Sequence, residues 1–206
     1  QSVWDCFQGP FRSYQTWVDW LSTNKPNFSL ERFPFTERTF NNYQASLNCY
    51  HFTYKVGNVA VDGFIIYPKK YDHALPAIIY NRGGNTSYGR NTFGRMMFRH
   101  MPLAAQNYVI IGSDYRGAGT RLRADEFVAD GTVDEFGGID VNDVTALIPI
   151  IEALPFADET RIGVLGGSRG GMQSFLLAKA YPDIKAMAVV AGLTDVFSIR
   201  DRDEKA

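Results

Sequence analysis

The 206-residue sequence lacks the features that mark several large classes of protein. It carries 21 basic against 22 acidic residues, so it lacks the positive excess typical of proteins that bind nucleic acids. It also lacks any apolar run of about 18 residues, which a membrane-spanning helix would need. We therefore expect no nucleic-acid partner and no transmembrane segment. The length and the 45% hydrophobic content are sufficient for a globular domain with a buried core.

Cysteine is scarce, with only Cys6 and Cys49, and there is neither a C-x-x-C pair nor a histidine placed to complete a zinc site. We expect no metal. A single disulfide is compatible with this pattern, but two buried thiols are favoured. The sequence begins at Gln1 without methionine or an apolar leader, which indicates a start removed by processing or during production. This slightly favours a periplasmic or secreted location over the cytoplasm.

The first part of the chain, residues 1–50, is rich in aromatic and polar side chains and contains one helix-like stretch at Tyr14–Leu21 before Pro26. We interpret it as an N-terminal cap or wrap, whose aromatic rings pack on the main body. Residues 51–206 would then form the main domain.

The main domain begins with two β-rich runs separated by Gly57-Asn58, which predicts a hairpin. Four continuous apolar runs, typical of strands buried on both faces, are Leu75–Tyr80, Tyr108–Ser113, Arg161–Leu165 and Ile184–Ala191.

Helical patterns lie between these runs, at Ile139–Leu154, with a kink expected at Pro149, and at Gly170–Ala180. In the second helix Met172, Phe175 and Leu176 are expected to face inward. A hairpin followed by alternating strands and helices predicts an α/β fold with parallel central strands and helices on both faces.

The sequence motif that points to chemistry is Gly166-Gly167-Ser168-Arg169-Gly170-Gly171, which follows a predicted strand and precedes a predicted helix. This is G-x-S-x-G in the setting where a sharp turn presents a nucleophilic serine. We interpret Ser168 as that nucleophile; a glycine-rich turn that serves only close packing is the alternative. A nucleotide-binding G-x-G-x-x-G motif is excluded by the spacing.

A serine nucleophile needs amide donors for the oxyanion that it creates. The N–H of Arg169, directly after the serine, is one candidate. The second is expected from Arg82-Gly83-Gly84-Asn85, because this segment follows an earlier strand and its two glycines allow close approach of the backbone.

Three ordered segments, IIYNRGG, SDYRGAGTR and DETRIGVLGGSRGGM, resemble the catalytic domain of the prolyl oligopeptidase family of serine peptidases, over roughly residues 56–197. The resemblance implies an α/β-hydrolase fold, Ser168 as nucleophile and an oxyanion hole formed by Arg169, Gly83 and Gly84. Arg82 and Asn85 flank the glycines where many members have His-Gly-Gly-Pro, and we expect them to line a substrate loop. The expected activity is cleavage of a small peptide, with no cofactor.

Three charged residues near these segments are expected to be structural. Arg116, in SDYRG, would tie neighbouring loops by a salt bridge. Asp140 and Asp143 open the predicted kinked helix, where carboxylates favour the positive helix end, so we expect them to cap it.

No histidine follows Ser168, although the triad of these hydrolases runs in the order serine, acid, histidine. His51, His73 and His100 are expected to be packing or surface residues. We therefore expect the front part of a longer hydrolase, incomplete at its C-terminus, whose sheet is completed by further chain, a second polypeptide or a homo-oligomer. Alternatives are a carboxylesterase or acyl hydrolase on the same fold, or a non-catalytic scaffold.

Overall fold

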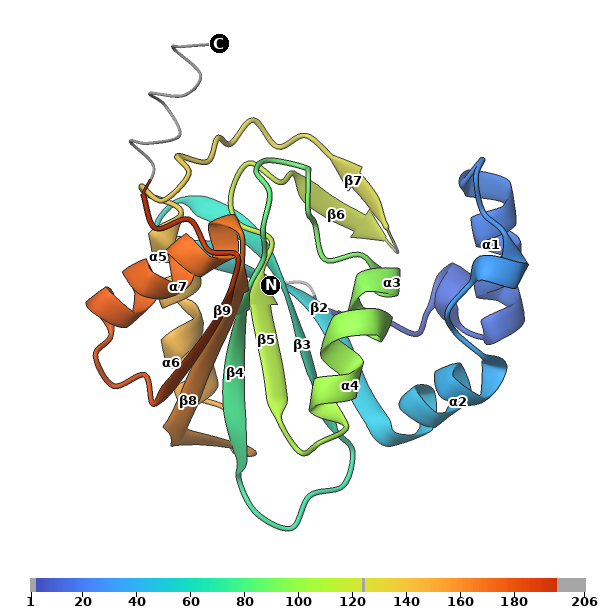
Figure 1. Ribbon diagram of the computed structural model, residues 1–206, viewed down its shortest axis with the longest axis horizontal. Coiled ribbons are helices and arrows are strands. Elements are labelled where there is room, and N and C mark those ends of the chain that lie inside the picture. The colour runs from blue at the N-terminus through green and yellow to red at the C-terminus, as the bar shows by residue number, and fades with distance from the viewer. Residues whose placement is uncertain (1–2, 124, 196–206) are drawn as a thin grey trace.

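A seven-stranded sheet runs through the middle of the molecule and carries helices on both faces (Figure 1). The computed structural model describes residues 3–123 and 125–195. In sheet order the strands are β1 (Val3–Asp5), β2 (Leu47–Val56), β3 (Val59–Pro68), β5 (Val109–Ser113), β4 (Leu75–Asn81), β8 (Ala157–Gly167) and β9 (Ala186–Val190). Pairing is antiparallel from β1 to β5 and parallel from β5 through β4 and β8 to β9. The predicted α/β fold class is confirmed.

The remaining elements are mostly short. A two-stranded antiparallel ribbon that the sequence analysis did not predict consists of β6 (Thr120–Arg123) and β7 (Glu126–Val128). The helices are η1 (Gly9–Phe11), α1 (Tyr14–Asn24), η2 (Leu30–Arg32), α2 (Glu37–Ser46), α3 (Phe93–Arg95), the π-helix η3 (Met96–His100), α4 (Met101–Ala104), α5 (Val141–Thr145), α6 (Leu147–Glu152) and α7 (Arg169–Ala180).

The predicted hairpin is β2–β3, whose register runs from Leu47 opposite Pro68 to Val56 opposite Val59. Gly57 has a φ of +60°, which the tight hairpin turn requires and which glycine adopts without steric cost.

Two hydrophobic cores form, one on each face of the sheet, because the central strands present apolar side chains alternately to both sides. The face toward α5, α6 and α7 buries Ile79, Ile111 and Val164 against Val144, Leu147, Ile151 and Leu177. The other face buries Ile66, Tyr80 and Ile110 against Phe93, Met96 and Met101, together with the N-terminal rings Phe11, Trp17 and Phe40. The aromatic N-terminal segment therefore packs on the main body. Its helices α1 and α2 lie at the side of the molecule away from α7 (Figure 1).

The kink expected at Pro149 is present as a break between α5 and α6 at Ala146. Proline has no N–H to donate to the carbonyl four residues earlier, so the helix is interrupted one turn before it. The two halves of the helix bury Val144, Leu147, Ile148 and Ile151.

Two expectations near the end of the described chain are wrong. In α7, Phe175 is 40% exposed, because the helix packs its glycine-rich side and Leu177 against the sheet instead. Strand β9 is not buried on both faces: Met187 and Val190 are 43% and 66% exposed. An apolar groove of about 600 Å³ lies beside Met187, lined by β4, β8 and β9 together with Leu103 of α4 and Tyr108 just before β5.

Cys6 and Cys49 form a disulfide, which corrects the expectation of two separate thiols. Pairing of β1 with β2 places Cys6 beside Cys49, with a hydrogen bond of 2.9 Å from the Cys6 amide to the Cys49 carbonyl and a Cα–Cα distance of 5.4 Å. That separation lies in the range that a disulfide spans. The bond fastens the N-terminal segment to the sheet.

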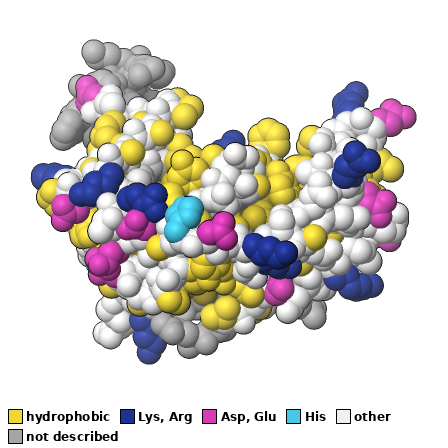
Figure 2. All heavy atoms as spheres, turned by 90° about the horizontal axis from the view of Figure 1, so that it is seen from below, with side chains coloured by type: hydrophobic (Ala, Val, Ile, Leu, Met, Phe, Trp, Pro, Cys, Tyr) yellow, Lys and Arg dark blue, Asp and Glu magenta, His cyan; other side chains and the backbone are white. Residues whose placement is uncertain are grey.

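The surface carries no dominant charge on the side seen in Figure 2, where basic and acidic side chains are interspersed. Of the helices in residues 3–123 and 125–195, none has both the length and the apolar character needed to cross a bilayer.

Candidate active site

Ser168 occupies a sharp turn between β8 and α7, with a φ of +54°, and is exposed to solvent. The turn is possible only because glycines lie two residues before and after it. A Cβ on Gly166 would overlap the carbonyl oxygen of Gly170, and a Cβ on Gly170 would overlap that of Asn81. The spacing of the motif thus has a steric cause, and the strained backbone of Ser168 presents its side chain outward.

The backbone of Ser168 is fixed by hydrogen bonds to both neighbouring elements. Its amide donates to the carbonyl of Val190 in β9 over 2.9 Å. Its carbonyl accepts from the amide of Gly171 in α7 over 2.9 Å. These contacts hold the turn between the strand and the helix.

A loop of residues 82–90, here called the glycine loop, follows β4 and lies against this turn. A Cβ on Gly83 would lie 3.0 Å from the carbonyl oxygen of Gly167 and 3.3 Å from the Cβ of Ser168. Within the described residues, the amides of Gly83, Gly84 and Arg169 donate to no protein acceptor. Three backbone donors without a protein acceptor thus lie beside an exposed serine.

The Arg82 side chain, expected to line a substrate loop, is fully buried instead. It holds the glycine loop from inside: Nη1 donates to the carbonyls of Gly83 (3.2 Å) and Tyr88 (2.7 Å), Nη2 to that of Thr86 (2.9 Å), and Nε to that of Asp114 (2.8 Å). The guanidinium therefore cannot face a substrate. Asn85, at the tip of the loop, is exposed.

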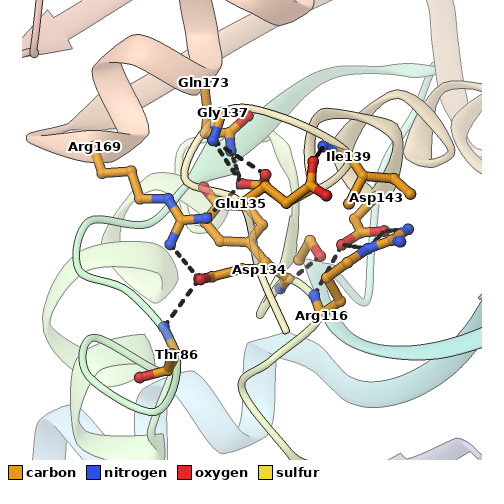
Figure 3. Close-up of polar contacts among 12 residues, drawn as sticks. Thr86, Arg116, Asp134, Glu135, Gly137, Ile139, Asp143, Arg169 and Gln173 are labelled. Atoms are coloured by element: carbon orange, nitrogen blue, oxygen red, sulfur yellow. Dashed lines mark hydrogen bonds and ion pairs between the residues drawn. The ribbon is translucent and has the colours of Figure 1, made fainter. Parts of the chain in front are cut away.

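The side chain of Arg169 is also buried and joins three segments (Figure 3). Nη1 donates to Asp134 over 2.5 Å and to the carbonyl of Gly84 over 3.1 Å, and Nη2 pairs with Asp140. Burial alone would lower the pKa of Arg169, but the two carboxylates outweigh it and the net pKa is raised. Arg169 is therefore cationic at any physiological pH.

The ring of Tyr115 lies beneath both guanidinium groups, at 4.8 Å from that of Arg82 and 5.0 Å from that of Arg169. Its hydroxyl donates to the carbonyl of Arg82 over 3.1 Å. Burial raises the pKa of Tyr115, so the hydroxyl stays protonated and remains a donor.

The two arginines fix the orientation of two successive peptide groups in the glycine loop. In a trans peptide the C=O and the following N–H point in opposite directions. Arg82 holds the carbonyl of Gly83, so the N–H of Gly84 points away from it; Arg169 holds the carbonyl of Gly84 in the same way. Glycine peptides rotate easily, so these bonds restrict a loop that would otherwise be flexible.

This geometry can be compared with known proteins. Residues 95–205, more than half of the chain, match the sequence profile described as the prolyl oligopeptidase family. The chain belongs to the prolyl oligopeptidase family. No curated protein is similar enough in sequence to count as a relative.

Solved structures of other hydrolases share the fold. Pyrococcus horikoshii acylaminoacyl peptidase is 21% identical over 78% of this chain, with a TM-score of 0.56. Porphyromonas gingivalis dipeptidyl peptidase 4 is 22% identical over 73%, with a TM-score of 0.53. Acetyl xylan esterase 1 from Thermoanaerobacterium sp. JW/SL YS485 is 21% identical over 92%, with a TM-score of 0.55. The chain spans 26%, 21% and 60% of their respective lengths, and the similarity shows an α/β-hydrolase fold.

This member of the prolyl oligopeptidase family uses Asp140 and Asp143 differently from the capping role expected. Asp140 lies at the N-cap position of α5 and Asp143 in its first turn, but the Asp140 side chain makes no capping hydrogen bond. Asp140 pairs with Arg169, while Asp143 pairs with Arg116 over 2.7 Å and also accepts from its amide over 2.8 Å (Figure 3). The salt bridge expected for Arg116 is confirmed. Capping was the wrong interpretation because both carboxylates are buried, where an arginine partner offsets the cost of losing water.

The three histidines lie apart from the turn. His51 is buried in β2, His73 is exposed before β4, and His100 is buried in η3, where its ring stacks on Phe64 at 4.7 Å. Burial lowers the pKa of His51, and that of His100 to about 3, so both are neutral. Within the part of the chain that the structure describes, no histidine contacts Ser168.

Proposed function

We propose that this chain carries the nucleophile and the oxyanion hole of a serine hydrolase that cleaves peptide bonds. One observation supports this most strongly: an exposed serine at positive φ lies beside three backbone amides with no protein acceptor. A turn that served only packing would have no reason to place an exposed hydroxyl beside three amides that lack an acceptor.

In the proposed reaction, the Oγ of Ser168 attacks the carbonyl carbon of the scissile bond and its proton passes to a histidine. The resulting oxyanion accepts hydrogen bonds from the amides of Arg169 and of Gly83 or Gly84. Collapse of the tetrahedral intermediate breaks the C–N bond, and the histidine protonates the departing amine. Water, deprotonated by the same histidine, then hydrolyses the acyl-enzyme.

The proton acceptor is proposed to come from polypeptide outside this sequence, because His51 and His100 are buried away from the turn and His73 lies in the exposed segment before β4. Further chain or a second polypeptide would deliver it to Ser168. The arrangement requires no metal and no cofactor. Among the described residues, no group of three or more metal-ligating side chains forms.

The first test uses a fluorophosphonate probe, which labels only activated serines, on the full-length protein that contains this chain. Wild type should be labelled, and Ser168→Ala should lose the label. Ser46→Ala is the matched control, because Ser46 is exposed at the end of α2 and should leave labelling unchanged. Equal labelling of wild type and Ser168→Ala would exclude Ser168 as the nucleophile.

A second test decides the bond that is cleaved. The wild type is compared on short peptide anilides and on p-nitrophenyl esters of matched acyl groups. We expect turnover of the anilides to depend on Ser168. Turnover of the esters alone would instead favour an esterase, and absence of both together with absence of labelling would favour a non-catalytic scaffold.

A further inference from the structure

A cavity of about 370 Å³ lies where the N-terminal segment meets the glycine loop. Its walls come from α1 and the segment after it, from residues 87–90 of the glycine loop, from the start of α3, and from β7. Three stretches far apart in the sequence thus enclose one space. None of the contacts described for Ser168 and Arg169 extends into it.

The wall of this cavity is in direct contact with the proposed oxyanion hole. Tyr88, which is 74% exposed, packs on Gly84 so closely that a Cβ there would lie 2.7 Å from its Cδ1. Gly89 lies directly beside Gly83: a Cβ on Gly89 would overlap the carbonyl oxygen of Gly83. The glycine loop therefore contacts the serine turn through Gly83 and forms part of the cavity wall through Tyr88 and Gly89.

Aromatic rings form much of the inner surface, contributed by Trp17, Trp20, Phe33 and Phe127. Trp17 packs edge to face on Phe33 at 4.8 Å, so the rings are held in place. Such a surface is suited to the apolar body of a ligand.

Cations surround the same space without carboxylate partners. Arg90 lies over the ring of Phe127 at 4.1 Å and donates to the carbonyl of Ala118, while its buried Nε has no acceptor. Arg95 donates to the carbonyl of Gly89 over 3.0 Å. Among the described residues neither arginine forms an ion pair.

The wall also holds one lysine and one carboxylate, so cations outnumber carboxylates in it. Lys25 lies over the ring of Trp20, 5.6 Å from its centroid. Asp125 is the carboxylate of the wall, but it pairs with Arg121 over 3.1 Å and accepts from the amide of Phe93. Burial lowers the pKa of Arg90, and the longer-range attraction of Asp114 does not fully offset this effect.

We propose that this cavity binds a carboxylate carried by the substrate, held by Arg90, Arg95 and Lys25, with the adjoining apolar part of the substrate against the tryptophans. The proposal rests on the proposed function, since it makes the cavity a subsite of the Ser168 centre. A guanidinium recognises a carboxylate through paired N–H donors, and Arg90 and Arg95 keep donors free for this.

The carboxylate could belong to an acidic side chain or to the C-terminus of a peptide, and binding distinguishes the two. Full-length Ser168→Ala protein is titrated with Ac-Ala-Ala-Phe-Glu-NH2 against Ac-Ala-Ala-Phe-Gln-NH2, and with Ac-Ala-Ala-Phe-Ala-OH against its amide. Calorimetry gives the Kd, and the fluorescence of Trp17 and Trp20 reports occupancy. We expect the carboxylate member of one pair to bind about tenfold more tightly than its amide.

Variants assign the preference to the cavity. Two variants are tested: Arg90→Met and, as a milder change at an exposed residue, Lys25→Met. Each should remove most of the preference for the carboxylate peptide, while the Kd of the amide peptides changes less than about twofold. Arg99→Met is the matched control, because Arg99 is exposed nearby but does not line the cavity. Equal affinities within both pairs, or a preference that survives Arg90→Met and Lys25→Met, would overturn the proposal.

This binding test does not require catalysis, so its result is separate from that of the proposed function. Labelling of Ser168 without any carboxylate preference would leave the nucleophile in place and refute the subsite.

Discussion

The arginines on the two sides of the glycine loop differ in their burial and in their partners. On the side of the serine turn, Arg82 and Arg169 are completely buried, and Arg169 has two carboxylate partners. On the side of the N-terminal segment, Arg90 and Arg95 are half-buried and bond only to carbonyl oxygens. The difference separates arginines that hold the loop from arginines that remain available to a ligand.

The physical basis of this difference is the cost of burying charge. A guanidinium removed from water needs an anion and a full set of acceptors, and removal of one partner leaves the other uncompensated. A half-exposed guanidinium keeps part of its hydration and can exchange the rest for a ligand. Substitutions should therefore have large effects on one side of the loop and small effects on the other.

The largest effect is expected for Arg169→Met, which leaves Asp134 and Asp140 without their cation. Unfolding in denaturant should show a loss of about 3–5 kcal/mol. Because the amide of residue 169 remains while the carbonyl of Gly84 is released, kcat of the full-length protein should fall at least about tenfold with little change in KM. Arg169→Lys should recover part of both. A variant as stable and active as wild type would show that the ion pairs do not hold the loop.

Removal of the disulfide tests the side of the glycine loop that faces the N-terminal segment. Cys6→Ser with Cys49→Ser should cost about 2–4 kcal/mol of stability, measured by denaturant unfolding. Because the bond fastens the segment that forms the far wall of the cavity, carboxylate binding should weaken, whereas fluorophosphonate labelling of Ser168 should persist under conditions where the protein is folded. Loss of labelling in the folded variant would show that the two sides are not separable.

Acid should destabilise the protein through His100, which lies in η3 on the face of the sheet that the N-terminal segment covers. The pKa of His100 is about 3 in the folded state and about 6.5 when unfolded, so below pH 6.5 the unfolded state takes up the proton first. Stability is therefore fully present above pH 6.5 and decreases toward pH 3, by about 2 kcal/mol at pH 5. Unfolding curves at pH 7 and pH 5 should show this loss, and His100→Phe should reduce it. An unchanged pH dependence in His100→Phe would contradict the assignment.

The smallest effect is expected for Arg90→Met, which leaves no carboxylate uncompensated. It removes one hydrogen bond and one cation–π contact, so the loss in denaturant unfolding should be less than about 1 kcal/mol. A loss as large as that of Arg169→Met would abolish the distinction between the two sides.

The sequence predicted the parts of this molecule that depend on local pattern. The strand runs, the hairpin at Gly57-Asn58, the kink before Pro149 and the turn around Ser168 all follow from periodicity or from residues with special backbone preferences. Contacts between distant segments were not predictable in this way. Cys6 and Cys49 are brought together by strand pairing, and Asp140 and Asp143 meet their arginines only once three loops are assembled.

The side chains of Arg82 and Arg169 show the same limit within the candidate site. Both were singled out from the motif that contains them, Arg82 as a substrate contact and Arg169 for its amide. Their burial could not be inferred, because arginine is rarely buried without a partner, and the aspartates that hold these two lie 29 to 35 residues away along the chain. One signal could have suggested this burial: arginines and aspartates cluster in the motifs that follow the buried strands.

The hydrogen bond from the amide of Ser168 to Val190 links the turn to β9, the outermost strand described on that side. Among the described strands β9 pairs with β8 alone, so its other edge has no strand partner within residues 3–123 and 125–195. A segment that pairs with this edge of β9 would shift the position of Val190 and, through the hydrogen bond, the orientation of the Ser168 side chain. The reactivity of Ser168 would therefore depend on completion of the sheet.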